Sequence, residues 1–248
     1  MYENAKFLAA GDSSVFMEFG NSISPEINAK IRNVVKGIES SAIKGITELL
    51  PTYRSIQIMY NPLELGYDEL IALLRDLSRS LPEGDGGDFR IVEIPTIYGG
   101  DYGPDLDFVA DHNQLSVEEV IKIHTSTDYL LYMLGFTPGF SYLGGMSDKI
   151  ATPRLKTPRT VIPAGSAGIA GTQTGIYPID SPGGWQLIGR TPLKMYDPTA
   201  EPPILLKAGD YVRFVSITED EYFKILKEVE NKSYKVNIII NGEVRRHE

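Results

Sequence analysis

Hydrophobic and polar residues alternate in four short segments of the first 80 residues, and apolar residues at helical spacing follow each pair of segments. A period of two is typical of strands with one buried face, whereas spacings of three and four are typical of amphipathic helices. We expect strands at 5–10, 14–19, 45–50 and 53–60, and helices from Ser24-Pro25 to near 37–41 and over 68–80. Two helices on one face of a mainly antiparallel sheet would form an α+β sandwich.

Residues 82–87 separate this pattern from the rest of the chain. They read PEGDGG, a composition typical of linkers. We therefore predict two domains, residues 1–88 and 89–248. The first contains no histidine and no phosphate loop, so we expect it to act as a scaffold or docking domain.

Glycine and proline are concentrated in the second domain. Residues 135–189 hold 11 of the 24 glycines, and residues 138–203 hold 10 of the 16 prolines. Helices and long strands do not tolerate that density, and the interleaved aromatic residues argue against disorder. We predict short strands of a closed or strongly curved β-structure, joined by structured loops.

More regular elements flank this region. Ser116 and Glu119 have the spacing of a capping box, which predicts the start of a helix that carries His124. Further strands are expected at 90–95, 204–206, 211–217 and 236–240, and a last helix at 219–230.

Composition narrows the classes of function. A net charge of −9 argues against a nucleic-acid partner. No apolar run approaches the roughly 20 residues of a membrane span and no leader pattern precedes the first strand, so we expect a cytoplasmic protein with no membrane partner. With no cysteine and three histidines, we predict no metal site in this chain.

Charge is distributed unevenly. Residues 136–200 contain six basic and three acidic side chains, so this region is positive inside an acidic protein. Such a region suits a small anionic ligand, although basic residues in loops are also commonly just solvated.

Common catalytic signatures are absent: we find no Walker loop, no dinucleotide fingerprint, no HExxH and no GxSxG. Two other segments stand out, LGFTPGFSYLGGM at 134–146 and RTVIPAGSAGIAGTQTGIYPIDSPGGWQLIGRT at 159–191. Their glycines would let the backbone approach a ligand, and their aromatic residues would supply apolar walls. The alternative is a barrel whose glycines and prolines only turn corners.

These two segments, with IYGGDYGPDLDFVA at 97–110 and EVIKIHTSTDYLLYMLGF at 119–136, resemble the family that contains the B subunit of bacterial 5-oxoprolinase. The same family includes the kinase inhibitor KipI and subunit 1 of allophanate hydrolase, and it is similar to part of urea amidolyases. The resemblance implies an N-terminal ferredoxin-like α/β sandwich followed by a C-terminal cyclophilin-like β-barrel, an α+β class overall. Fold alone does not bring prolyl isomerase activity with it.

The resemblance also implies a function in a complex. The chain would work with a C subunit, which is KipA-like, and an A subunit in the ATP-dependent hydrolysis of 5-oxo-L-proline to L-glutamate. ATP and Mg²⁺ would then be required by the complex, and without a phosphate loop here they would be bound mainly by the partner. The isolated chain would be inactive.

His124 is the candidate catalytic residue, which would hydrogen-bond substrate or a phosphorylated intermediate. It lies near the apolar face of its helix, so a buried structural histidine is the alternative. Ser166 has no base beside it in the sequence, and we reject it as a nucleophile.

The remaining candidates would bind substrate. Phe140 and Tyr142 would line a pocket or pack in the core, and Trp185 would serve as a core anchor or a ligand wall. The expected polar contacts are backbone N–H groups of Pro163, Ala164, Gly165 and Ser166 to an anion, Gln173 and Tyr177 to the amide, and Arg159 or Arg190 to the carboxylate.

Three other functions stay open. The chain could bind a sensor histidine kinase as KipI does, it could belong to allophanate or urea metabolism, or it could be a structural subunit whose pocket is vestigial.

Overall fold

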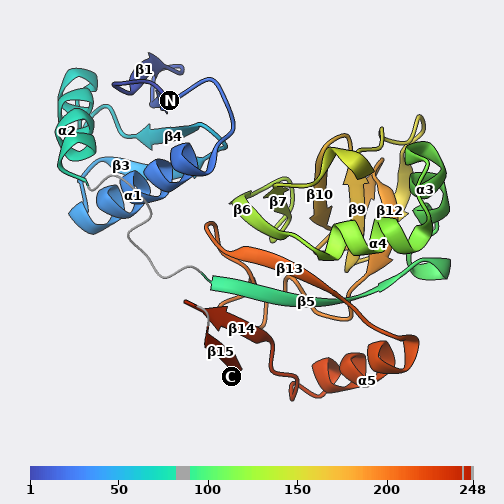
Figure 1. The fold of residues 1–248 in the computed structure, drawn as a ribbon. Helices are drawn as coiled ribbons and strands as arrows, with labels where there is room; N and C mark the ends of the chain where they lie inside the picture. Colours follow the sequence, from blue (N-terminus) through green and yellow to red (C-terminus); the bar gives the residue numbers. More distant parts are fainter. Residues whose placement is uncertain (82–89, 242, 247–248) are drawn as a thin grey trace. The chain divides into compact units, whose positions relative to one another are not determined.

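The computed structural model describes residues 1–81, 90–241 and 243–246 (Figure 1). Contacts divide the chain into two units, Met1–Gly87 and Asp88–Glu248. The predicted linker, 82–87, and the predicted boundary between residues 88 and 89 lie outside the described residues.

Four antiparallel strands and two helices form the N-terminal unit. The strands lie in the order β1-β2-β4-β3. Their bounds are β1 Lys6–Ala9, β2 Ser14–Glu18, β3 Ile46–Pro51 and β4 Ser55–Tyr60, and the helices are α1 Pro25–Ser41 and α2 Tyr67–Ser80. The predicted α+β sandwich is confirmed, with every expected element of this unit present.

One apolar cluster holds this unit together. Alternate residues of β2 and β4, such as Met17 and Ile58, are buried against Ile31 of α1 and Leu74 of α2. The sequence sets where α1 begins, because the Ser24 side chain accepts a hydrogen bond from the Ile27 N–H and Pro25 occupies the first turn.

A closed seven-stranded barrel forms the C-terminal unit, as predicted. The strands follow the order β12-β9-β10-β7-β6-β13-β5, and β12 pairs with β5 to close the ring. Their bounds are β5 Arg90–Tyr98, β6 Asp128–Leu134, β7 Ser141–Gly144, β9 Ser166–Ala170, β10 Gln173–Ile176, β12 Gln186–Arg190 and β13 Tyr211–Ser216. Strands β5 and β13 are parallel, whereas the other pairs are antiparallel.

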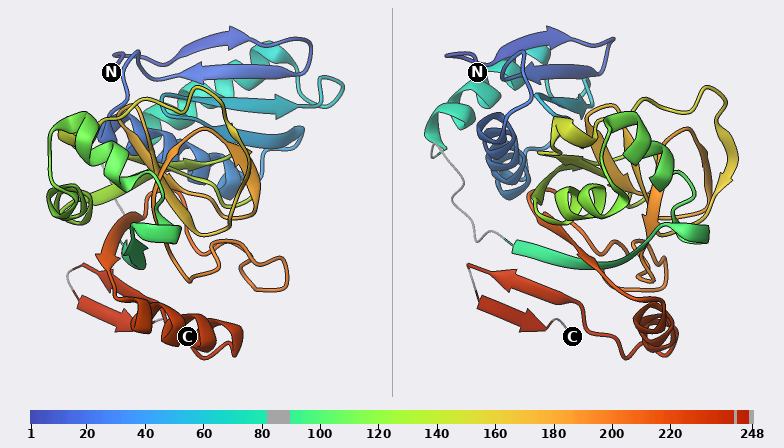
Figure 2. Two further views of the ribbon diagram at one scale, coloured as in Figure 1. Left: turned by 90° about the vertical axis from the view of Figure 1, so that its right-hand side faces the viewer. Right: turned by 45° about the vertical axis from the view of Figure 1, so that its right-hand side comes forward.

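Shorter elements surround the barrel. They are the 3-10 turns η1 Gly100–Tyr102 and η2 Asp148–Ile150, the helices α3 Leu106–Asn113, α4 Val117–Thr125 and α5 Glu219–Glu230, the strand pair β8 Arg159–Ile162 and β11 Ser181–Gly183, and the hairpin β14 Asn237–Ile240 with β15 Glu243–Arg246. Figures 1 and 2 show α5 and the hairpin on the opposite side of β5 from α3 and α4. The predicted capping box of α4 is present in full.

Two sequence expectations differ from the fold. Helix α3 was not expected. The strand predicted at 204–206 is wrong, since Ile204 makes only a single bridge with Tyr196. Pro202 and Pro203 precede it, and neither has an N–H with which to extend a ladder.

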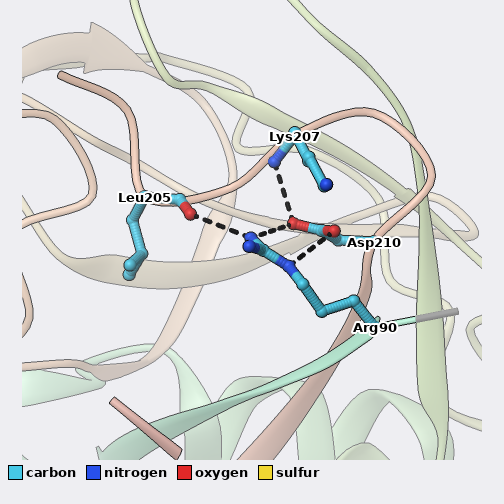
Figure 3. A network of polar contacts seen from close by, with 4 residues as sticks. All are labelled: Arg90, Leu205, Lys207 and Asp210. Atoms are coloured by element: carbon cyan, nitrogen blue, oxygen red, sulfur yellow. Dashed lines mark hydrogen bonds and ion pairs between the residues drawn. The ribbon is translucent and has the colours of Figure 1, made fainter. Parts of the chain in front are cut away.

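A buried ion pair fastens the start of β5 to the turn before β13 (Figure 3). Arg90 donates from Nε and Nη2 to the two carboxylate oxygens of Asp210, at 3.0 and 2.7 Å, and also to the Leu205 carbonyl oxygen at 3.3 Å. The Lys207 N–H donates to the same carboxylate at 2.9 Å. Asp210 is only 1% exposed, so these contacts compensate the desolvation of the pair.

Candidate functional site

The two glycine-rich segments meet at an aromatic cluster of Phe140, Tyr142, Tyr177 and Trp185 on one side of the barrel. The Phe140 ring makes edge contacts with Tyr142, Tyr177 and Trp185 at centroid distances of 5.2, 5.4 and 5.6 Å. Three of the four side chains are buried, and Tyr142 packs against them while half-buried. The structure therefore brings three predicted substrate-binding residues together, around the one tryptophan.

Glycine makes this arrangement sterically possible. A Cβ at Gly183 would collide with the Tyr177 hydroxyl oxygen, and a Cβ at Gly175 would lie 3.2 Å from the Trp185 ring. Burial raises the pKa of the Tyr177 hydroxyl, and the side chain, only 2% exposed, is part of the core of this cluster.

Phe136 contacts this cluster through the Phe140 ring and was not among the expected site residues. It is 66% exposed, its φ is +65°, and its ring contacts the Phe140 ring edge-on at 5.5 Å. Hydrogen bonds from the Gly135 N–H to the Phe140 carbonyl oxygen and from the Phe140 N–H to the Thr137 carbonyl oxygen close its loop. A non-glycine residue with a left-handed backbone conformation destabilises the fold. Such strained residues are found often in functional loops.

Arg159 has a partner within the chain. It donates to Asp105 at 2.8 Å and to the Trp185 carbonyl oxygen at 3.4 Å, and the other Asp105 oxygen accepts from the Leu187 N–H at 2.6 Å. Asp105 thus links α3, β8 and β12 behind the aromatic cluster. Arg159 supports the tryptophan, which argues against its predicted role as a substrate carboxylate partner. No motif in the sequence pointed to Asp105.

The loop at 163–166 does not present N–H groups to an anion, which corrects our expectation. The Ala164 N–H donates to Asp180 at 2.7 Å, the Gly165 N–H to the Tyr177 carbonyl oxygen at 2.7 Å, and the Ser166 N–H to the Pro163 carbonyl oxygen at 3.2 Å. Proline has no N–H of its own. The glycine is required here, because its φ is +82° and a Cβ would collide with the Thr191 carbonyl oxygen.

Arg190 lies at the end of β12 and differs from Arg90, Arg159 and Arg213 in its partners. Its guanidinium carbon is 5.7 Å from the centre of the Tyr102 ring. Its Nε is buried and has no hydrogen-bond partner within the described residues. No ion pair to it is found in the described ranges, whereas Arg90, Arg159 and Arg213 each have a carboxylate partner.

A pocket of about 450 Å³ lies between the barrel loops and α5. Its walls mix prolines, aliphatic residues, two tyrosines and three charged groups. The lining residues are Ala164, Pro178, Ile179, Asp180, Thr191, Pro192, Leu193, Lys194, Tyr196, Asp197, Pro198, Tyr222 and Leu226. Among the predicted site residues only Ala164 lines this pocket, which has the size of a small-molecule site.

The pocket and the aromatic cluster are neighbours. Pro178 directly follows Tyr177, and a Cβ at Gly139 would lie 3.3 Å from both Pro178 and Tyr196. The loop that carries Phe136 therefore reaches the pocket wall. Gln173, at the start of β10, pairs in register with Ala170, which packs in the aromatic cluster.

His124 lies apart, buried in the barrel core. Thr174 donates its hydroxyl hydrogen to the Gly168 carbonyl oxygen, so its oxygen accepts from Nε2–H of His124 at 2.8 Å. Burial lowers the pKa of His124 to about 3, and the neutral ring then accepts at Nδ1 from the Tyr98 hydroxyl at 2.7 Å. Both ring nitrogens are engaged, which favours the structural alternative; the catalytic role stays a prediction.

Neither a metal centre nor a membrane span emerges from the described residues. Within 1–81, 90–241 and 243–246, no three His, Asp or Glu side chains gather in a way that could hold a metal ion. No helix in these ranges is long and apolar enough to cross a bilayer.

Comparisons with known proteins agree with the resemblance seen in the sequence. The family described as "Carboxyltransferase domain, subdomain C and D" matches residues 5–206. The B subunit of 5-oxoprolinase from Bacillus subtilis is 48% identical over 224 residues, which are 86% of this chain and 92% of that protein. The urea amidolyase of Saccharomyces cerevisiae is 26% identical over 92% of this chain and 14% of its own length.

A solved structure supports the same assignment. The crystal structure of TTHA0988 shares 36% sequence identity with this chain at a TM-score of 0.74. The match covers 83% of this chain and 40% of that one, so this chain spans less than half of TTHA0988. The chain belongs to the carboxyltransferase subdomain C and D family, together with the B subunit of 5-oxoprolinase.

Proposed function

We propose that this chain is the B subunit of a 5-oxoprolinase, a hydrolase complex that opens 5-oxo-L-proline to L-glutamate. The observation that carries the proposal is the 48% identity to the B subunit of the Bacillus subtilis 5-oxoprolinase along 92% of that protein. The site chemistry is compatible with it. A pocket of small-molecule size beside an aromatic cluster suits a compact ring.

We further propose that the chain acts only with a C and an A subunit. Opening a resonance-stabilised lactam requires activation of its carbonyl, for which ATP and Mg²⁺ are a reasonable source. The described residues do not fit these groups, because they include no carboxylate cluster for a metal ion and the sequence has no phosphate loop. We therefore assign nucleotide and metal mainly to the partner. A reaction that consumes ATP would place the complex in the cytoplasm.

The test is reconstitution. ADP and glutamate release are measured with 5-oxoproline as substrate, for this chain alone, for the A and C subunits alone, and for the full mixture. Turnover confined to the full mixture supports the proposal. Turnover by A and C without this chain, or by this chain alone, contradicts it.

A second candidate is a role in urea or allophanate metabolism, which the similarity to urea amidolyase favours. The same mixtures with urea or allophanate as substrate distinguish the two. Stable assembly with the partners but no turnover of any of the three substrates would instead favour binding to a histidine kinase.

A further inference from the structure

Two buried polar atoms without a partner belong to residues that are paired on the barrel wall. They are Nε of Arg190 and Oγ of Ser166, and neither has a hydrogen-bond partner in the described parts of the chain. The two residues are directly paired in register between β12 and β9, and residues paired in this way project from the same face of a sheet.

The neighbouring side chains supply no hydrogen-bond partner for Nε of Arg190 or Oγ of Ser166 in the described parts of the chain. The Tyr102 ring covers the Arg190 guanidinium at 5.7 Å, and the Tyr222 ring of α5 lies 4.9 Å from Tyr102. The neighbouring carboxylate of Glu219 accepts from the Tyr102 hydroxyl at 3.2 Å and forms no ion pair with Arg190. A buried donor without an acceptor destabilises a fold, so its retention points to an acceptor supplied from outside.

The two residues do not line the pocket between the barrel and α5, but residues next to them in the sequence do. Thr191 follows Arg190 and lines the pocket, as do Ala164, two residues before Ser166, and Tyr222. The pocket wall contains the apolar residues Pro192 and Leu193 and also the charged side chains of Asp180, Lys194 and Asp197. A ligand held here would present one charged group to Arg190 and its uncharged body to Pro192 and Leu193.

We propose that Arg190 and Ser166 form an oxyanion-binding subsite next to this pocket. A guanidinium donates in a planar fork that matches a carboxylate or a phosphate, and the serine hydroxyl adds a third donor. The identification of the ligand as the carboxylate of 5-oxoproline rests on the proposed function. The subsite itself rests on the geometry alone.

The test is ligand-induced thermal stabilisation of the full chain, followed by calorimetric titration. The probes are 5-oxoproline, 2-pyrrolidinone, which is the same ring without the carboxylate, and inorganic phosphate. We expect 5-oxoproline to raise the melting temperature and 2-pyrrolidinone to leave it unchanged. Arg190→Gln should weaken 5-oxoproline binding at least tenfold, about the loss of one charge-assisted hydrogen bond.

Controls separate binding from folding. Arg54→Gln makes the same charge change at an exposed position of the N-terminal unit and should bind as the wild type does. Ser166→Ala should weaken binding by a smaller factor. Ser166→Ala removes an atom that lacks a partner, so this unliganded variant should unfold at or above the wild-type temperature. Arg190→Gln also loses the contact with the Tyr102 ring and should unfold close to the wild-type temperature.

The outcomes are decisive for the subsite. Binding of phosphate but not of 5-oxoproline, abolished by Arg190→Gln, supports the subsite and counts against the proposed substrate. Binding of either oxyanion that survives Arg190→Gln overturns the subsite, as does a wild-type chain that binds neither. Turnover in the reconstituted complex tests the proposed function separately.

Discussion

A single buried histidine illustrates how this fold can bury polar side chains. His124 is linked to Tyr98 on one side and to Thr174 on the other, so its ring completes a chain of hydrogen bonds across the barrel core. Without it the Tyr98 hydroxyl would lose this acceptor, at a cost of about 1–3 kcal/mol, whereas Thr174 would keep its bond to Gly168. The ring is neutral in the folded state, and this has a consequence for stability at acid pH.

Stability should fall between pH 7.5 and pH 5.5 in a manner that depends on His124. Its pKa is lowered to about 3 by burial, whereas the unfolded chain protonates it near the ordinary value of 6.5. Below pH 6.5 the unfolded state therefore binds a proton that the folded state does not, and one pH unit below 6.5 the loss is about 1.4 kcal/mol. Denaturant unfolding of the wild type and His124→Gln at both pH values measures the difference.

The matched control is His112→Gln, which changes an exposed histidine. It should keep the wild-type dependence on pH, whereas His124→Gln should lose about 1.4 kcal/mol of it. An unchanged slope in His124→Gln would show that the ring is not held neutral.

Phe136 should matter for function more than for stability. Its ring is mostly exposed and its loop is closed by backbone hydrogen bonds, so Phe136→Ala should change the free energy of unfolding by less than about 1 kcal/mol. Turnover of the reconstituted complex should fall about fivefold or more, the usual effect of removing an exposed aromatic anchor. Phe223→Ala, at an exposed position of α5, is the control and should retain turnover.

At the scale of elements, the stability of the barrel depends on the contacts that β5 makes with its neighbours. This strand pairs with β13 and β14 from its first residues and with β12 at its last two, so Arg90 lies next to the ladders with β13 and β14. The Arg90–Asp210 ion pair is almost fully buried there, with side-chain exposures of 17% and 1%. The Arg213–Asp128 pair in the same sheet is about one-third exposed.

These two ion pairs should differ in their contribution to stability. Arg90→Gln leaves a buried carboxylate without its counter-ion and should cost about 3 kcal/mol. Arg213→Gln removes a partly solvated pair and should cost about 1 kcal/mol or less. Equal losses in equilibrium unfolding would show that burial does not set the contribution of these pairs.

Local signals in the sequence predicted most elements. The Ser24-Pro25 start of α1 and the capping box of α4 involve residues a few positions apart, which the sequence displays directly. Helix α3 was missed because Asp105 makes no side-chain cap and instead bonds to β12 and β8, far along the chain.

The candidate site was less predictable for the same reason. The sequence predicted that Phe140 and Tyr142 line a pocket or pack in the core, and the structure packs both with Tyr177 in one cluster; their role in binding substrate stays a prediction. The sequence could not show which of Arg159 and Arg190 has a carboxylate partner within the chain, because the ion pair between Arg159 and Asp105 is visible only in the folded structure. Backbone N–H groups of the 163–166 loop were likewise assigned to a ligand before their partners in the chain were visible.

At the scale of the whole molecule, the chain has separate apolar cores. The N-terminal core contains Ile58, and the main barrel core contains Ile94; no buried residue belongs to both clusters. A unit that buries its own core can unfold on its own. Trp185, the only tryptophan, lies in the barrel unit, and its fluorescence therefore reports on that unit alone.

Two core truncations should consequently have different effects on one signal. Ile94→Ala should destabilise the barrel by about 2–5 kcal/mol and shift the Trp185 transition to lower denaturant. Ile58→Ala should cost the N-terminal unit a similar amount, visible by far-ultraviolet circular dichroism, while the Trp185 transition stays in place. If Ile58→Ala also shifts the Trp185 transition, the units unfold as one cooperative body. The N-terminal unit would then stabilise the barrel that carries the site.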